Sequence, residues 1–338
     1  MVSSKDVAKL AGVSQSTVSR VLNNPDNVKV QNREKVLRAM EQLGYYPNLI
    51  ARSLVTKSTR TIALISGTLN NGFYVEATES IVHLAKKRGY NTIVYFEDEQ
   101  EIPDFFESVM GYKVDGVLLS LINLDDPVVE RLRQSKLPHV FFNRRPRTGG
   151  NYVTLDNITA AQLLTKHLLD LGHRRIAFVS GTNNVSTFHE RQLGFENSLR
   201  SADVEISPEL VHNINPSKQE VEKVTNHLLQ LPTRPTAIVC ATDSMALACM
   251  NVILEKGLRI PDDISIAGFD NIGITSHRSI QLTTVGNEGE SMGELAANAL
   301  IDMLENSGAH NGKNNEVIIQ RVLRPKLVVR KTTGKVKR

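Results

Sequence analysis

The chain of 338 residues has no tryptophan, two cysteines and no long apolar run. Cys240 and Cys249 cannot build a disulfide framework and do not form a CxxC pair, so we expect core thiols in a reduced, cytoplasmic setting. No stretch reaches the roughly 18 apolar residues of a membrane-spanning helix, so no membrane partner is expected. The start, MVSSKDVAKLAG, lacks the apolar core of a signal peptide.

The sequence also lacks the short motifs that mark common enzyme and metal sites. It contains no GxSxG, P-loop, HExxH or CxxC pattern, the spacings that hold a nucleophile, a phosphate or a metal. Its nine histidines are scattered, and we expect His167 and His173, at a predicted helix end, to cap or pack. We therefore predict neither an enzyme nor a bound cofactor.

Charge is present but unevenly distributed along the chain. The formal net charge is +4, yet residues 1–60 carry ten Lys and Arg against four Asp and Glu. Residues 61–320 carry 22 against 32, and residues 321–338 carry eight against none. A basic head on an acidic body is typical of a protein that binds a polyanion, although a basic solvated face gives the same count. We expect the last basic residues to form a frayed, solvated tail.

The basic head has the pattern of three short helices. The first helix ends at Gly12, because glycine adopts a positive φ at little cost. Ser14 caps a second helix from Gln15 to about Asn23, and a third helix runs from about Gln31 to Leu43. This arrangement predicts a helix-turn-helix unit. A generic three-helix domain with a polar surface is the alternative.

The predicted second helix presents polar side chains away from its buried face. Val18, Val21 and Leu22 recur at three and four residues and face inward. The polar residues on its other faces are Gln15, Ser16, Ser19 and Arg20. Because a major groove admits one helix, such a surface can offer amide and guanidinium groups to base edges.

Residues 48–60 follow the break at Pro47 and include the segment LIARSLVTKS. Ile50, Ala51 and Leu54 fall on one face of a short predicted helix. An isolated helix of about ten residues is marginal in water, so it would form stably only against a partner. A plain linker is the alternative.

From residue 61 onward, short apolar strands alternate with amphipathic helices. The predicted strands are residues 61–66, 91–96, 114–120, 139–142, 175–180, 236–241 and 265–269. This order is typical of parallel sheets covered on both faces. Two such series predict an α/β fold with two Rossmann-like subdomains and a ligand cleft between them, beyond the carboxyl ends of the strands.

Polar residues follow several of these strands and are candidates for contact with a ligand. They are Asn143, Arg144, Asp156, Asn157, Asp243 and Asp270. Each has a plainer interpretation as well. Asp243 precedes a predicted helix and can cap it, and Asp270 begins the turn DNIG, where it can form an Asx turn.

Several stretches closely resemble the lactose-repressor family of bacterial transcription regulators. They are KDVAKLAGVSQSTVSRVLN, LGYYPNLIARSL, KKRGYN, VDGVLLS, LLDLGHRRIAFVSG, RPTAIVCATDSMAL, GLRIPDDISIAGFDNI and LTTV. The resemblance covers nearly the whole chain. It implies a DNA-binding head, a hinge helix and a core of periplasmic-binding-protein type. It also implies a repressor that binds a palindromic operator as a homodimer and is switched by a small-molecule effector. A sensor whose head binds something other than DNA, and a two-lobed enzyme, are the competing hypotheses.

The resemblance also assigns DNA contacts by position. In the second helix they are Gln15, Ser16, Thr17, Ser19 and Arg20. In the hinge they are Ala51, Arg52 and Leu54. Arg20 suits guanine and Gln15 suits adenine, whereas Thr17 and Ser19 would support phosphate contacts or packing. Leu54 matches a leucine that wedges into the minor groove and kinks the operator.

By the same resemblance, six core residues would contact the effector. They are Phe73, Asn143, Thr187, Arg191, Thr242 and Asp270. Arg191 has an alternative role, since it can pair with Glu190 or Glu196 on its own helix. The sequence departs from the family at Asn143, where Asp is frequent, and at Pro216, where many members have an aromatic. We expect a sugar or related metabolite, whose identity and direction of effect the sequence does not give.

The predicted organisation has four parts. They are a helix-turn-helix domain (1–47), a hinge helix and linker (48–60), an effector-binding and dimerisation core (61–332) and a basic tail (333–338). Within the core, the first subdomain takes about 61–158 and 289–320, and the second takes about 159–288 and 321–332. No leucine heptads follow the core, so we expect a dimer rather than a tetramer built by a terminal helix.

Overall fold

The computed structural model describes residues 2–23, 25–46, 58–96, 107, 109, 111–306 and 318–337. The chain divides into two units, Met1–Thr59 and Arg60–Arg338, called here the head and the core. None of the helices in these ranges is long and apolar enough to cross a membrane.

The head contains the three helices that the sequence predicts. They are α1 (Ser4–Ala11), α2 (Gln15–Asn23) and α3 (Val30–Leu43), with a short η1 (Pro25–Asn27) between the last two. Val7, Val18 and Val36, one from each helix, are fully buried against one another. These apolar contacts fix how the three short helices pack.

The helix ends of the head follow the local signals in the sequence. Gly12 ends α1 with a φ of 64°. Ser14 precedes α2, and its Oγ accepts a hydrogen bond from the N–H of Thr17 at 3.2 Å. Lys29 precedes α3 and makes no side-chain capping bond, so this helix start is the weaker one.

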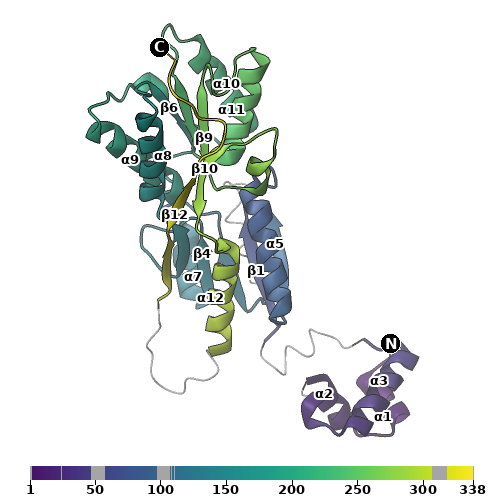
Figure 1. The fold of residues 1–338 in the computed structure, drawn as a ribbon. Coiled ribbons are helices and arrows are strands. Elements are labelled where there is room, and N and C mark those ends of the chain that lie inside the picture. The colour runs from purple at the N-terminus through teal and green to yellow at the C-terminus, as the bar shows by residue number, and fades with distance from the viewer. Residues whose placement is uncertain are drawn as a thin grey trace. The chain divides into compact units, whose positions relative to one another are not determined.

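The first lobe of the core is built on a parallel sheet (Figure 1). Its strand order is β11-β5-β4-β3-β1-β2. The strands are β1 (Thr61–Ser66), β2 (Asn91–Phe96), β3 (Gly116–Leu119), β4 (His139–Phe142), β5 (Tyr152–Leu155) and β11 (Gln320–Leu323). Its helices are α5 (Gly72–Lys87), α7 (Pro127–Ser135) and α12 (Met292–Asn306).

The second lobe repeats this design with strand order β12-β10-β9-β8-β6-β7. The strands are β6 (Ile176–Ser180), β7 (Val211–Asn213), β8 (Ala237–Cys240), β9 (Ser265–Phe269), β10 (Thr283–Asn287) and β12 (Pro325–Val328). The helices are α8 (Asn157–Asp170), α9 (Ser186–Ser201), α10 (Lys218–Gln230) and α11 (Asp243–Glu255), with η2 (Pro208–Leu210) and η3 (Gly273–Ser276). β12 pairs antiparallel with β10, which the strand pattern of the sequence does not predict.

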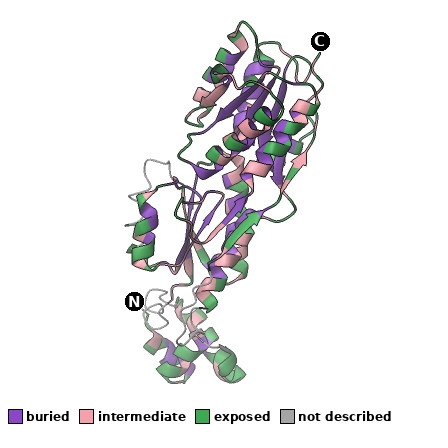
Figure 2. Cartoon of the chain, turned by 90° about the vertical axis from the view of Figure 1, so that its left-hand side faces the viewer, coloured by how far each residue is buried: buried purple, intermediate pink, exposed green. Residues whose placement is uncertain are grey.

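Alternate side chains of β1 pack on opposite faces of the first sheet. Ile62 and Leu64 belong to one hydrophobic cluster, whereas Ala63 and Ile65 belong to another. Figure 2 shows the inner strands of both sheets mainly in the buried class, with mixed burial on the helices around them. The expectation of sheets covered on both faces is therefore met, and Cys240 and Cys249 are fully buried in the second lobe.

The described residues of the core include three passages of the chain between the two lobes. It crosses after β5, between β10 and α12, and between β11 and β12. The last crossing corrects a predicted boundary, since we expected residues 321–332 in the second subdomain. Arg321–Leu323 pair with β5 in the first sheet instead, because β11 completes the edge of that sheet before the chain crosses.

The segment after β12 packs on the second lobe, so the expectation of a frayed tail is wrong for its described residues. His167 Nε2 lies 2.9 Å from Thr333 Oγ1. His173 Nε2 lies 3.0 Å from the carbonyl oxygen of Gly334, and Lys337 Nζ lies 2.6 Å from an Asp262 carboxylate oxygen. The two histidines thus pack, as predicted, and what they hold in place is the end of the chain.

Candidate functional site

The outward face of α2 is polar, as the sequence predicts. Val18 and Val21 are buried. The exposed residues of this helix include Gln15, Ser16, Ser19 and Arg20. A narrow polar helix surface of this kind fits the dimensions of a DNA major groove.

The first turn of α2 is tied to its surroundings by hydroxyl groups. Ser14 Oγ lies 2.7 Å from Ser16 Oγ and 2.8 Å from Thr17 Oγ1. Gln15 Nε2 donates to Ser4 Oγ at 3.0 Å. These bonds hold the start of α2 against α1, and they agree with a supporting role for Thr17.

Three of the predicted DNA contacts, Ala51, Arg52 and Leu54, lie outside the described residues. The hinge helix therefore stays a prediction of the sequence.

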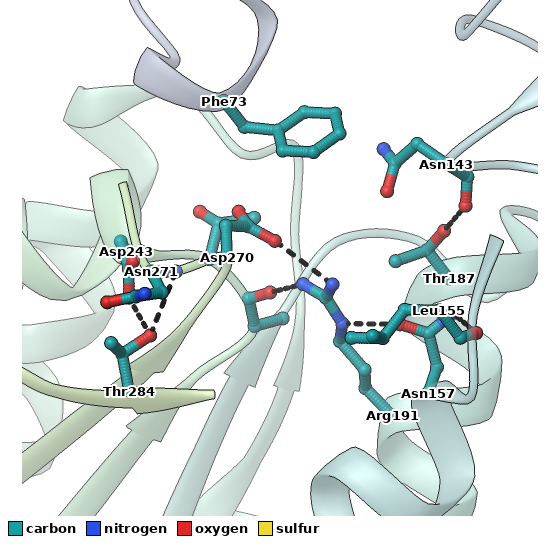
Figure 3. A network of polar contacts seen from close by, with 12 residues as sticks. Phe73, Asn143, Leu155, Asn157, Thr187, Arg191, Asp243, Asp270, Asn271 and Thr284 are labelled. Carbon is teal, nitrogen blue, oxygen red and sulfur yellow. Dashed lines mark hydrogen bonds and ion pairs between the residues drawn. The ribbon is translucent and has the colours of Figure 1, made fainter. Parts of the chain in front are cut away.

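Five of the six predicted effector residues, all but Thr242, surround a common space between the lobes (Figure 3). Phe73 lies in the first turn of α5, and Asn143 follows β4 in the first lobe. Arg191 and Thr187 lie on α9, and Asp270 follows β9 in the second lobe. The fold thus gathers residues up to about 200 positions apart in sequence at the carboxyl ends of parallel strands, where α/β sheets bind ligands.

Arg191 is the centre of this cluster, and its side chain is only 2% exposed. Its Nε donates to Asn157 Oδ1 at 2.9 Å, and one terminal nitrogen donates to the Ala241 carbonyl. The other donates to Asp270 Oδ1 at 3.0 Å. The guanidinium also lies 4.7 Å from the centroid of the Phe269 ring. These partners satisfy a buried cation that would otherwise be costly to desolvate.

The alternative prediction, that Arg191 pairs with Glu190 or Glu196 on its own helix, is wrong. Glu190 pairs with Arg145 at 2.6 Å, and Glu196 pairs with Arg200 at 2.7 Å. The guanidinium turns instead to Asp270, which lies in another element.

Asp270 is held in an unusual backbone conformation, with a φ of 108°. Its side chain is 6% exposed. Burial raises the pKa of this carboxyl to about 6, although Arg191 acts in the opposite direction. Strained backbone is retained where the surroundings fix it, and it concentrates at ligand sites.

The predicted cap role of Asp243 is wrong, because Thr242 caps α11. Thr242 Oγ1 accepts from the N–H of Met245 at 3.2 Å. Asp243 instead accepts from the Thr284 hydroxyl at 2.6 Å and the Ile272 N–H at 3.1 Å. Burial, followed by the charge of Asp270, raises the pKa of Asp243 well above its usual range. Asp243 thereby fastens the turn after Asp270 to β10.

Asn143 and Thr187 join the lobes directly. Asn143 has a φ of 64°, and its carbonyl accepts from Thr187 Oγ1 at 2.6 Å. The side-chain amide of Asn143 remains directed toward the space beside Phe73 (Figure 3). An amide there can both donate to and accept from a polar ligand.

Comparison with known proteins places this arrangement in a family. Residues 4–48 match the profile described as "Bacterial regulatory proteins, lacI family". Residues 165–333 match the profile of a periplasmic binding protein-like domain. The "HTH-type transcriptional repressor PurR" of Mannheimia succiniciproducens is 32% identical over 99% of this chain and 100% of its own length. The chain belongs to the lacI family.

Other relatives of this lacI-family protein support the same family assignment. The "Probable HTH-type transcriptional repressor ExuR" of Bacillus subtilis is 33% identical, over 90% of this chain and 92% of its own. The Lac repressor dimer bound to operator and the anti-inducer ONPF superposes with a TM-score of 0.84 and 27% identity, covering 98% of this chain and 99% of that one. A transcriptional regulator solved as a CelR–cellobiose complex superposes with a TM-score of 0.71 and 30% sequence identity. The match covers 98% of this chain and 100% of that one. This lacI-family chain is thus a DNA-binding transcriptional regulator with a helix-turn-helix head and a two-lobed effector-binding core.

The sequence did not predict the contacts of three residues beside the site, Glu190, Arg145 and Asn157. Glu190 entered only as a possible partner of Arg191, and Arg145 did not enter at all. Asn157 was noted only as a polar residue after a strand, yet it is 2% exposed and bonds Arg191. No sequence signal could find these contacts, because each joins groups from different elements.

Proposed function

We propose that this lacI-family regulator represses transcription from a palindromic operator, which it binds as a homodimer, and that a small molecule between the core lobes switches it. The curated relatives are transcriptional repressors, which supports repression rather than catalysis. A regulator of bacterial DNA works in the cytoplasm, and we assign the chain to that compartment.

In the proposed DNA complex, α2 enters the major groove. Arg20 and Gln15 read bases, Ser16 assists them, and Thr17 and Ser19 serve phosphate contacts or packing. Segment 48–60 forms the hinge helix on DNA, where Leu54 wedges into the minor groove between Ala51 and Arg52. The exposed polar face of α2 supports this assignment.

The observation that carries the effector site is the buried pair of Arg191 and Asp270 beside Phe73 (Figure 3). Arg191 supplies donors, Asp270 supplies acceptors, and Asn143 supplies both, while Phe73 offers an apolar ring. Thr187 adds a hydroxyl group beside Asn143, and we assign Thr242, the cap of α11, to the same site. This set suits a polyhydroxylated metabolite such as a sugar, and the relative solved with cellobiose is consistent with that class.

An apolar surface on the core supports the homodimer. Val75 and Val82 of α5 are 41% and 37% exposed, and their spacing of seven residues places them on one helix face. Ile274, 48% exposed, follows Gly273, whose N–H donates to Glu76 of α5 at 2.7 Å. The surface formed by Val75, Val82 and Ile274 is called the α5 face, and we assign it to the dimer contact.

DNA capture tests the first part of this proposal. The full chain is mixed with fragments of its source genome, and the bound fragments are sequenced. We expect a shared palindrome whose affinity falls steeply with salt. Fragments without a common motif, or binding insensitive to salt, would contradict operator recognition.

The effector site is tested on that operator with a panel of sugars and sugar derivatives. We expect one compound to change operator affinity, and we expect Asp270→Asn to abolish this response while binding of operator alone changes little. Asp263→Asn, a surface carboxylate of the same lobe, is the matched control and keeps the response. A full response in Asp270→Asn would exclude this site.

A further inference from the structure

The side-chain amide of Asn157 hydrogen-bonds to a member of each of two charged pairs, Arg191–Asp270 and Arg145–Glu190. Its Oδ1 accepts from Arg191 Nε at 2.9 Å. Its Nδ2 donates to the Leu155 carbonyl at 3.1 Å and to Glu190 Oε2 at 3.2 Å. Only this orientation works, because the reverse would place an NH₂ against the Arg191 N–H and an oxygen against a carboxylate oxygen.

Glu190 carries the connection onward to the first lobe. Its other oxygen, Oε1, accepts from an Arg145 guanidinium nitrogen at 2.6 Å. The Arg145 N–H also donates to Ser186 Oγ at 2.9 Å. Arg145 follows β4 of the first lobe, whereas Ser186 and Glu190 lie on α9 of the second. These bonds, called here the rim clasp, hold the two lobes together on one side of the site.

The position of Asn157 suits a transmitting role. It is the first residue of α8, directly after the crossing from the first lobe to the second. It is 2% exposed, so water cannot replace its bonds at low cost. A shift of the Arg191 side chain toward a ligand therefore changes the bonding of Asn157, and Asn157 in turn holds one oxygen of Glu190.

We propose that Asn157 is a positioning residue that couples the Arg191–Asp270 pair to the rim clasp of Arg145 and Glu190. This inference rests on the proposed function, since it assigns the regulation of the same site. Effector contact with Arg191 or Asp270 changes the strength of the clasp, and breaking the clasp changes effector affinity by the same factor. The relative orientation of the lobes thus responds to effector binding through one buried amide, that of Asn157.

Hydrogen exchange tests the coupling on the full chain without DNA or added ligand, so its outcome is independent of operator and effector identity. Two first-lobe amides report the rim, Arg145 N–H and Leu124 N–H, which donates to the Asn184 carbonyl at 2.6 Å. In Asn157→Ala we expect both to exchange about tenfold faster, while the amides of β8 remain unchanged. Asn251→Ala, an exposed asparagine on α11, is the matched control and should leave the rim amides unaltered.

A second comparison separates coupling from simple support of the fold. Asp270→Asn should change the exchange of the Arg145 amide about threefold in the native background and not at all in the Asn157→Ala background. Glu190→Gln is measured in parallel, and it should accelerate the same two amides even if Asn157→Ala does not fold. Unchanged rim amides, equal acceleration in β8, or an effect of Asp270→Asn that survives without Asn157 would each overturn the proposal.

Discussion

At the scale of single residues, the decisive feature is the buried ion pair of Arg191 and Asp270. Arg191 and Asp270 are 2% and 6% exposed. Replacing a buried ion pair with apolar residues is often neutral or stabilising, so such a pair is weak evidence of a stabilising role. A polar ligand, by contrast, needs a donor and an acceptor already in place. The pair is therefore better explained by recognition than by stability.

The raised pKa of Asp270 predicts how stability depends on pH. Burial raises this pKa to about 6 in the folded chain, above the value near 3.9 of an unfolded aspartate. The folded state therefore binds the extra proton between these values, and ionisation of Asp270 lowers stability as pH rises through 6. In Asp270→Asn this loss is absent. Between pH 4.5 and 7.5, we expect the stability of the variant relative to the native chain to rise by about 2 kcal/mol, as measured by urea unfolding of the core.

Asp263→Asn is the control with the opposite sign. Hydrogen bonds from Arg259 hold the pKa of Asp263 below its usual range. The ionised Asp263 carboxylate stabilises the fold above its unfolded pKa, and this stabilisation is lost as pH falls. The stability of Asp263→Asn relative to the native chain should therefore not increase as pH rises. A pH-independent difference between Asp270→Asn and the native chain would show that Asp270 titrates normally.

The residues of the site could be predicted from sequence better than their contacts. Asp270, Arg191 and Asn143 were identified by resemblance and by their places after strands, or on a helix beside one. The partners of Arg191 were not, because local spacing favours Glu190 and Glu196 whereas the fold supplies Asp270, 79 positions away. Thr242 and Asp243 show the same limit. The residue that caps α11 is Thr242 rather than Asp243. Asp243 instead bonds to Thr284 and Ile272, which no local sequence pattern connects with it.

At the scale of elements, α8 and α9 are packed too closely for any side chain at Gly194. A Cβ there would lie 2.3 Å from the Ile158 carbonyl oxygen and 2.8 Å from Ala161 Cβ. Gly194→Ala should force the helices apart and destabilise the core by about 1–3 kcal/mol. Because α9 carries Arg191, the effector response should weaken as well. Thermal unfolding measures the first effect.

Gly111→Ala is the control for that change. A Cβ at Gly111 meets nothing within 4 Å, so alanine should be neutral or slightly stabilising there. Equal melting temperatures for Gly194→Ala and the native chain would mean that the two helices separate at no cost.

The helix α2 makes a prediction about specificity. Arg20→Ala should relax the choice of one operator base pair and reduce binding to the best site by about 1–3 kcal/mol. Affinity is measured on operators changed one position at a time. A uniform loss across all sequences would instead identify Arg20 as a phosphate contact. Lys35→Ala, an exposed basic residue on α3, tests how much general charge contributes.

The elements themselves followed the sequence closely wherever local patterns determine them. The strands at 61–66, 91–96, 139–142 and 265–269 have the predicted bounds, because each is a short apolar run between turn signals. The antiparallel pairing of β12 and the docked end of the chain were not predicted. Both depend on partners from distant parts of the second lobe, such as β10 and His173.

At the scale of the whole molecule, operator binding depends on the distribution of charge along the chain and on dimer formation. The basic head meets DNA electrostatically, and the acidic body limits nonspecific adhesion of the core to the same polyanion. A dimer adds a second requirement, because two heads reach a palindrome together only when their cores remain joined. Dimer formation should therefore raise operator affinity, because both heads then bind the same palindrome.

Val82→Asp tests that requirement. The side chain of Val82 is exposed on α5, so the substitution should leave the fold and thermal stability of the core intact. A charge in an apolar contact would be desolvated without a partner, so we expect the sedimentation mass to fall from two chains to one. Operator affinity should fall about 100-fold, since each head then binds a half-site alone. Val322→Asp, at an exposed position of edge strand β11, should retain the dimer. A native mass of one or four chains would contradict the homodimer. A Val82→Asp variant that remains dimeric would exclude the α5 face as the contact.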